Sequence, residues 1–567
     1  MDYPAEPLTA DERALLAPHV TSLDGPVFAL VGLPETVKGA LFARYSRYPG
    51  TLRRLMIDEF ADDLAAAGTP APAALAAPTP APAPAALAAS TPAALTPATD
   101  LPAPAAQPGG GRAAQLYERI FLGYGDDSVA QLGGAHVACE WASNILTKIL
   151  QRPRLAAYLE QSTRYIAYDA PMGQGGFRYY RDPSLGSGYT AAMDSLFRTY
   201  AAAIPVVSAW AERTFPVAEG ESPAAHARAI KAKALDLLRG LLPAASLSHM
   251  GIYASGQTYE QLILHLLAHP LPEARAYGTM ILQELQPVIG SFLTRVDRPD
   301  RGGRWIDYLA ERAAAGQRWA QRLGLDGRPG QDDTRPGPSV RLLHVDGTEQ
   351  DLLCALLFES SGVPEEDAHA AIGRLTAAER TAMLSDLVGD RENRRHRPGR
   401  GLEAVRYRFE IVADYGAFRD LQRHRMLTVQ WQPLTPDLGA DVPAQVAEAG
   451  AGEEYRHALE VSAEAYQRLR DAGRADAAPY ALCLGYRMRF VLDLNAREAM
   501  QMIELRSGRE GHPSYRAVAH EMHALIGEIH PAIAAAMRHV DTETEPRLER
   551  ILAEMRTQAR ATVARPS

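Results

Sequence analysis

FRDLQRHRMLTVQWQPL, residues 418–434, places four cationic side chains close together at its centre: Arg419, Arg423, His424 and Arg425. The preceding run VRYRFEIVAD, residues 405–414, alternates apolar and polar residues, which predicts a half-buried strand. Gly416 can end that strand, and a short helix would then carry Arg419 and Arg423 on one face. The cations therefore lie at a predicted strand–helix–strand junction. Guanidinium groups there can bind phosphate or a flat anionic ring through paired hydrogen bonds, and the alternative is a solvated basic face.

A second segment, NAREAMQMIELR (residues 495–506), predicts a helix with two polar stripes. Asn495 and Arg506 are separated by about three helical turns and share a face. Arg497 and Gln501 are four residues apart on a neighbouring stripe. Two adjacent polar faces suit a helix placed between two ligands, and the alternative is a surface helix with solvated charges.

Together these two segments resemble the signatures of flavin-dependent thymidylate synthases. The RHR triplet at 423–425, preceded by Arg419 and Asp420, resembles the first signature, and residues 495–506 resemble the family's N-x-R…R helix. The two segments follow one another in the order that the family uses.

The first half of the chain carries a related but different remnant of the same pattern. RPRLAAYLEQSTRYI, residues 152–166, aligns Pro153 with His424 and continues into Glu160–Tyr165, which resembles the family's E-x-S-x-R-Y. RGLLP, residues 239–243, resembles the family's Arg-x-x-Leu-Pro. The second half has Trp431 and Pro433 where the first has Glu160 and Ser162, whereas the first half lacks the N-x-R…R residues. The chain therefore reads as an internal duplication whose copies have lost complementary parts.

The predicted fold class is α+β, with two tandem copies of a small antiparallel sheet flanked by helices and packed as a pseudo-dimer within the chain. We expect a disordered Ala/Pro-rich insertion at about 65–112, where the composition cannot form a core. The expected organisation is an N-terminal extension (1–26), a first copy (27–322), a linker (323–339) and a second copy (340–567).

The resemblance implies reductive methylation of dUMP to dTMP, with FAD as cofactor and with NADPH and methylene-tetrahydrofolate as co-substrates. Arg506 would polarise the uracil ring electrostatically and act with Ser162 as a catalytic residue. The residues implied for FAD are Arg423, His424, Arg425, Asn495, Arg497, Gln501 and, in a basic loop that could also be simply solvated, His396. The residues implied for dUMP are Arg419, Asp420, Glu160, Gln161, Ser162, Thr163, Arg164, Arg239 and Arg506. Two chains would reproduce the family's four-subunit assembly as a homodimer.

Composition restricts the remaining function classes. The formal net charge of −9 argues against general nucleic-acid binding, and no apolar run approaches the ~20 residues that cross a bilayer. Three cysteines in 567 residues indicate a reducing, cytoplasmic environment. Cys139 and Cys483 lie in apolar contexts that predict buried, inert thiols rather than nucleophiles.

Histidine spacing predicts no metal site. His520 and His523 lack the H-E-x-x-H spacing of zinc enzymes, and His265 and His269 precede Pro270 with no nearby carboxylate. The competing hypothesis for the whole chain is a degenerate, catalytically inactive paralogue that binds flavin or nucleotide in a regulatory or interaction role. A module that binds RNA through its arginine runs fits the acidic net charge poorly.

Overall fold

The computed structural model describes residues 3–68, 116–117, 119, 128–172, 176–325 and 336–563. Helix α3 (Leu52–Gly68) extends through residues 65–68, the first four of the predicted disordered insertion. The rest of that insertion falls almost entirely outside the described residues. The helices away from the site are α1 (Ala10–Leu16), α2 (Glu35–Tyr45), α10 (Arg304–Arg322), α15 (Ala444–Glu448) and α19 (Pro531–Ala536).

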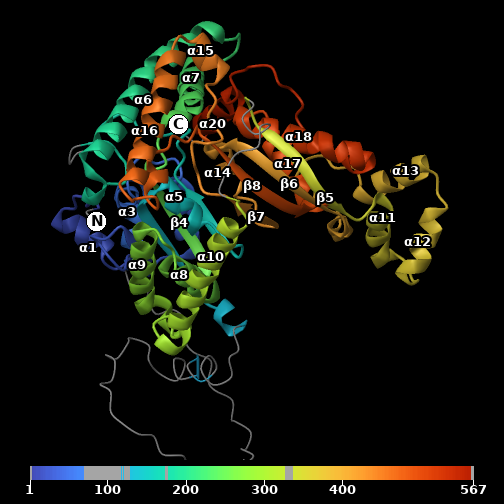
Figure 1. The fold of residues 1–567 in the computed structure, drawn as a ribbon, viewed down its shortest axis with the longest axis horizontal. Helices are drawn as coiled ribbons and strands as arrows, with labels where there is room; N and C mark the ends of the chain where they lie inside the picture. The colour runs from blue at the N-terminus through green and yellow to red at the C-terminus, as the bar shows by residue number, and fades with distance from the viewer. Residues whose placement is uncertain are drawn as a thin grey trace, which may run out of the picture.

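Two antiparallel four-stranded sheets with the same strand order form the framework (Figure 1). The first sheet has the order β1-β2-β4-β3 and the second β5-β6-β8-β7. Their strands are β1 (Val27–Leu30), β2 (Gly134–Ser143), β3 (Ala156–Glu160), β4 (Leu247–Ser255), β5 (Ser339–Asp346), β6 (Arg406–Asp414), β7 (Leu427–Trp431) and β8 (Arg487–Asn495). The repeated topology confirms the predicted α+β fold with tandem copies.

Equivalent helices follow equivalent strands in the two halves. A short helix succeeds the second strand of each sheet, namely α5 (Asn144–Leu150) and α14 (Tyr415–Leu421). A longer helix follows β4 in the first half and β8 in the second, namely α8 (Gly256–Leu267) and α17 (Ala496–Arg506). The helices that cover the sheets and join them are α6 (Gly186–Thr214), α7 (Pro223–Leu238), α9 (Pro272–Ile289), α16 (Gly452–Asp471) and α18 (Pro513–Ile529).

The halves meet across a local pseudo-twofold axis at the residues that come just before β4 and β8 in the sequence. Pro243 bridges Cys483, and the amide of Ala244 donates to Leu482 O at 2.7 Å. The reciprocal bond runs from Leu484 N to Leu242 O at 2.8 Å. One buried hydrophobic cluster runs through both halves, so each half completes its core against the other.

A swapped acid–hydroxyl pair marks the start of the short helix in each half. In the first half, Ser143 caps α5 and its hydroxyl donates to Glu273 at 2.6 Å. In the second half, Asp414 caps α14 and accepts the hydroxyl of Ser514. Acid and hydroxyl have changed places, and each helix N-terminus keeps an oxygen acceptor.

Two segments differ from the sequence prediction. The amphipathic pattern of residues 224–248 predicts one long helix, whereas α7 ends at Leu238 and the strand β4 begins at Leu247. The last helix, α20 (Ile551–Val563), was expected to complete the second copy, but it packs on α7 of the first half (Figure 1).

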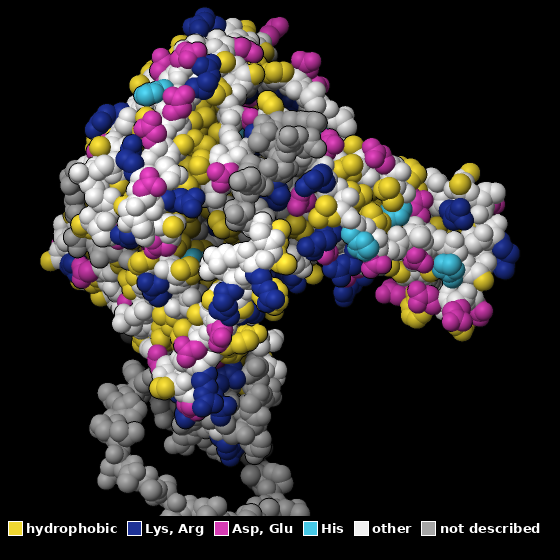
Figure 2. Space-filling model, viewed as in Figure 1, with side chains coloured by type: hydrophobic (Ala, Val, Ile, Leu, Met, Phe, Trp, Pro, Cys, Tyr) yellow, Lys and Arg dark blue, Asp and Glu magenta, His cyan; other side chains and the backbone are white. Residues whose placement is uncertain are grey.

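A small helical projection leaves the second half after β5 (Figure 1). It consists of α11 (Glu349–Leu357), α12 (Glu365–Gly373) and α13 (Ala377–Val388). Acidic side chains gather over α12, which begins with Glu365, Glu366 and Asp367 (Figure 2). Across the part of the chain that the structure describes, no helix combines the length and apolarity needed to span a bilayer.

Candidate active site between the halves

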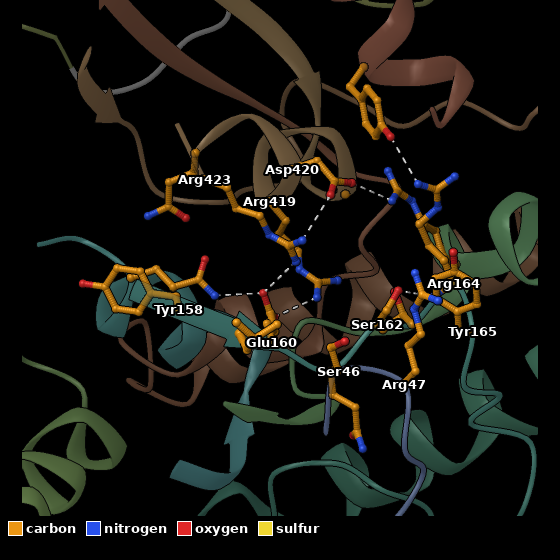
Figure 3. A pocket seen from close by; sticks show the side chains of 18 of the residues that line it. Ser46, Arg47, Tyr158, Glu160, Ser162, Arg164, Tyr165, Arg419, Asp420 and Arg423 are labelled. Carbon is orange, nitrogen blue, oxygen red and sulfur yellow. Dashed lines mark hydrogen bonds and ion pairs between the residues drawn. The ribbon is translucent and has the colours of Figure 1, made fainter. Parts of the chain in front are cut away.

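A cavity of about 420 Å³ opens where the first-half loop after β3 faces the second-half α14 (Figure 3). Both halves contribute its charged walls. The lining includes eight arginines, namely Arg47, Arg164, Arg239, Arg419, Arg423, Arg425, Arg506 and Arg550, and three acidic residues, namely Glu160, Asp420 and Glu510. The excess of guanidinium groups makes the cavity a receptor for an anion.

Glu160, at the end of β3, is the charged centre of one wall. One carboxylate oxygen accepts from Arg419 at 2.9 Å, and the other accepts from Lys148 at 2.8 Å and Arg423 at 3.1 Å. Although burial alone would raise the pKa of Glu160, the charges of Lys148, Arg419 and Arg423 hold it well below its usual value. The carboxylate is therefore ionised and fixes two second-half arginines at the cavity.

Lys148 lies behind this wall and is fully buried. Burial lowers the pKa of Lys148 to about 7. The charge of Glu160 opposes this shift, but the charges of Arg419 and Arg423 add to it. Lys148 stands on α5 at the position that Arg419 holds on α14, so equivalent residues of the two halves converge on one carboxylate.

Arg506, at the end of α17, is held by a short chain of hydrogen bonds. Its Nε donates to Nε2 of His424 at 3.0 Å, and Nδ1 of His424 lies 2.8 Å from Glu498. Burial lowers the pKa of His424, so the ring is neutral, with its proton on Nδ1 facing the carboxylate. Tyr515 also contacts Arg506, whose guanidinium carbon lies 5.5 Å from the centroid of the tyrosine ring, and Arg506 lines the cavity.

Arg239 crosses from the first half to Asp420 of the second at 3.0 Å. Burial alone would raise the pKa of Asp420, but Arg239 first and then Arg423 and Arg506 hold it far below its usual value. Nε and Nη2 of Arg239 and Nε of Arg419 are buried with no hydrogen-bond partner among the described residues. Buried donors of this kind need an acceptor from water or a ligand.

The loop after β3 carries the residues predicted to hold the phosphate. Ser162 and Arg164 line the cavity, and Arg164 is also bound by both oxygens of Asp236 at 2.6 and 2.7 Å (Figure 3). Thr163 lines the cavity too and is 3% exposed. Gln161 also lines it, although its side-chain amide holds the loop by donating to Tyr48 O and accepting from Arg178.

The structure therefore brings together all nine side chains predicted for the substrate, with Arg423 beside them. Glu160, Gln161, Ser162, Thr163, Arg164 and Arg239 of the first half line one cavity with Arg419, Asp420, Arg423 and Arg506 of the second. Their separation along the sequence is bridged by the pseudo-twofold packing of the halves.

The residues predicted for FAD do not gather in the same way. Arg423 and Arg425 line the cavity, and Arg425 lies 6.0 Å from the ring of Tyr158. His424 is behind the wall, with both ring nitrogens engaged. The remaining four, which do not line this cavity, are His396, Asn495, Arg497 and Gln501.

Three of these four side chains have partners elsewhere. The ring of His396 meets Asn393 at 3.0 Å, and Asn495 caps α17. Arg497 donates to Pro398 O at 3.0 Å and pairs with Glu403 at 3.3 Å. The seven residues predicted for FAD thus do not all lie at this cavity.

The alternative of solvated charges on α17 is wrong for its acidic residues. Glu498 is 5% exposed and Glu504 2%. Glu504 pairs with the guanidinium of Arg391 at 2.6 Å, so the basic loop before β6 is anchored at its first arginine.

Cys139 and Cys483 are fully buried, as predicted. Burial raises the pKa of Cys483 to about 12 and that of Cys139 further, so neither supplies a thiolate near neutral pH. His520 and His523 each bond a backbone carbonyl through Nε2.

Several residues at the site had no signal in the sequence motifs. Lys148, Asp236, Tyr515, Arg47 and Arg550 lie outside the matched signatures. The duplication itself held a usable signal for Lys148, because alignment of α5 with α14 places it opposite Arg419.

The sequence match identifies the family. The sequence model for thymidylate synthase complementing proteins matches residues 81–289 and 351–532, and the chain belongs to that family. A UPF0159 protein of Chlamydia muridarum is 34% identical over 559 residues, covering 97% of this chain and 98% of the relative. A UPF0159 protein of Thermoplasma acidophilum is 31% identical, covering 79% and 93%.

Among solved structures, a UMP/dUMP methylase PolB from Streptomyces cacaoi bound with 5-Br dUMP is similar at 19% identity. That likeness has a TM-score of 0.30 and covers 36% of this chain and 96% of the other.

Proposed function

We propose that this protein binds dUMP in the cavity between its halves and methylates the uracil ring at C5. The observation that carries the proposal is the convergence of arginines from both halves on one cavity, where Arg239 and Arg419 keep buried N–H groups that find no acceptor among the described residues. Family membership supports the same chemistry. The proposed reaction replaces the C5 hydrogen, released as a proton, by a methyl group.

The first-half loop provides the phosphate end of the proposed site. Ser162 and Arg239 supply a hydroxyl and a guanidinium fork, and a dianionic phosphate satisfies donors of both kinds. Arg239 is also fixed by Asp420, so its remaining nitrogens are already oriented before a ligand enters.

Arg506 provides the base end. A cation beside the uracil carbonyl draws negative charge toward that oxygen, which makes C5 more nucleophilic without a cysteine adduct. The neutral His424 and the Glu498 carboxylate orient Arg506, and its burial excludes water that would screen its charge.

The proposal extends to the sources of the methyl carbon and of the hydride. By family resemblance, methylene-tetrahydrofolate would be the carbon donor, and FAD, with NADPH as its reductant, would supply the hydride that completes the methyl group. Arg423 and Arg425 are the two predicted flavin ligands that lie at the cavity. The domain boundaries after residues 26, 322 and 339, cytoplasmic location and a homodimer belong to the same proposal.

The direct test is tritium release from dUMP labelled at C5, with methylene-tetrahydrofolate and NADPH, together with the absorbance spectrum of the purified protein. We expect release in the wild type, and loss of release in Ser162→Ala and in Arg506→Ala. Loss in both, with each variant folded, would support a site shared between the halves. Absence of release from a wild type that binds dUMP would contradict the proposal.

That last outcome would favour the second candidate, a relative that binds nucleotide without turnover. The observation behind it is the dispersal of the predicted flavin residues, four of which lie away from the cavity. Bound flavin without tritium release would select this candidate as well.

A further inference from the structure

The C-terminal segment 541–563, here called the C-terminal strap, returns from the second half to the first. Lys233 of α7 pairs with Glu549 at 2.5 Å in a buried contact, and Arg228 pairs with Glu554 at 2.8 Å. The strap lies beyond residue 532, where the family match ends.

The strap places Arg550 in the wall of the cavity. Arg550 is 5% exposed, and its guanidinium carbon lies 4.2 Å from the ring centroid of Tyr165. Arg47 lies 4.9 Å from the same centroid. Figure 3 shows Arg47 and Tyr165 beside the loop of Ser162 and Arg164. Because Arg550 lies against the same tyrosine ring and lines the cavity, both cations stand at the proposed phosphate end.

Arg164 and Arg550 differ in how far their donors are already used. Every guanidinium nitrogen of Arg164 donates within the protein, to Asp236, to the hydroxyl of Tyr515 and to Glu510 O. Arg550 makes only a longer ion pair from Nε to Asp236 at 3.5 Å. Its Nε and Nη1 are buried and have no hydrogen-bond partner in the described part of the chain.

Unpartnered donors on a buried, permanently charged group indicate a missing anionic acceptor. Asp236 does not meet this need, because its nearer oxygen lies 3.5 Å from Nε of Arg550 and makes no hydrogen bond to it. A ligand oxygen in the cavity meets the need, since Arg550 belongs to the cavity lining.

We propose that Arg550 of the C-terminal strap is a phosphate-binding residue of this cavity and directly contacts the 5′-phosphate of the mononucleotide. Arg164 then acts mainly as a positioning residue that holds the loop against Asp236. This inference rests on the proposed function and adds a ligand from outside the segment that defines the family. It makes the strap a determinant of selectivity for nucleotides over nucleosides.

The test measures dissociation constants for dUMP and for deoxyuridine by titration calorimetry on the full chain. We expect Arg550→Gln to weaken dUMP binding by about 10- to 100-fold, the usual range for a lost charged hydrogen bond, and to leave deoxyuridine binding unchanged. Arg550→Lys, which keeps the charge and loses the fork, should fall between wild type and Arg550→Gln. Inorganic phosphate should compete with dUMP less well in Arg550→Gln than in wild type.

Arg547→Gln is the matched control, because Arg547 belongs to the strap, does not line the cavity and donates to Glu543 O. It should leave both dissociation constants unchanged. The ratio of dUMP to deoxyuridine affinity is taken within each sample, so partial loss of folding does not imitate the effect. Equal losses for both ligands, or none, in Arg550→Gln would overturn the inference and leave the proposed function standing. A wild type that binds no dUMP would remove both.

Discussion

The two halves of this protein have equivalent sites with opposite chemistry. In the cavity, Arg423 pairs with Glu160 at 3.1 Å. At the equivalent positions, Arg152 stands 5.4 Å from the ring of Trp431. Leu266 takes the place of Arg506, and Pro479 takes the place of Arg239. The cavity keeps charged side chains at these positions. The equivalent positions of the other site hold the apolar residues Trp431, Leu266 and Pro479.

The difference shows how a duplicated chain can keep one site by dividing its parts. Each half alone carries only part of the proposed site, because the loop of Glu160–Tyr165 is kept only in the first half and the residues of the N-x-R…R helix only in the second. The pseudo-twofold packing brings these survivors to the same cavity. At the other site Arg152 keeps the ring of Trp431 as a partner, although burial and the charge of Arg312 lower its pKa.

Removal of the central charge should have the largest effect on stability. Glu160→Gln leaves Lys148, Arg419 and Arg423 without their shared carboxylate, and we expect the free energy of unfolding to fall by about 3–5 kcal/mol. Trp431→Phe at the equivalent position keeps a ring beneath Arg152 and should cost less than about 1 kcal/mol. Chemical denaturation of both variants measures the difference. An equal loss of unfolding free energy in the two variants would refute the assignment of Glu160 as the charged centre of the cavity wall.

The next effect concerns turnover. Arg506→Ala removes the cation proposed to polarise uracil, and tritium release should fall by about 10²- to 10³-fold, the range for a lost electrostatic contact in a transition state. Leu266→Met at the equivalent position conserves volume and should leave the rate unchanged. If both variants retain the wild-type rate, the base end of the cavity has been placed incorrectly.

Lys148 and Arg419 allow a pH test, because only the lysine can lose its proton. The pKa of Lys148 is lowered to about 7 in the folded chain, against about 10.4 in an unfolded one. Between these values the unfolded chain binds a proton that the folded chain does not, so this site makes the free energy of unfolding rise with pH. The slope approaches 1.4 kcal/mol per pH unit. Lys148→Arg copies its equivalent and should abolish this contribution, as followed by denaturation from pH 7 to 9. An unchanged slope would show that Lys148 stays charged.

Much of this arrangement could be predicted from the sequence, because the motifs that carry it are local. The cation cluster near residue 423, the polar faces of residues 495–506 and the duplicated register indicated a composite site. The end of α7 at Leu238 and the strand at residues 247–255 were not predicted, since a short apolar run has no period that distinguishes a strand from a helix. The roles of Asp236 and Arg550 depend on how the strap crosses to α7, and no local pattern encodes that crossing.

The smallest effect is expected at the site of Arg152 and Trp431. Arg152→Ala should leave the affinity for dUMP unchanged and should lower the free energy of unfolding by less than about 1 kcal/mol. Arg423→Ala, its equivalent, should weaken dUMP binding, because Arg423 lines the cavity while its partner Glu160 remains charged. Calorimetric titration of the two variants against dUMP compares them directly. A chain with one site should bind one dUMP in both wild type and Arg152→Ala. A second equivalent of dUMP in the wild type, lost in Arg152→Ala, would mean that the apolar site still binds ligand, and that the two halves divide their work less completely than their side chains indicate.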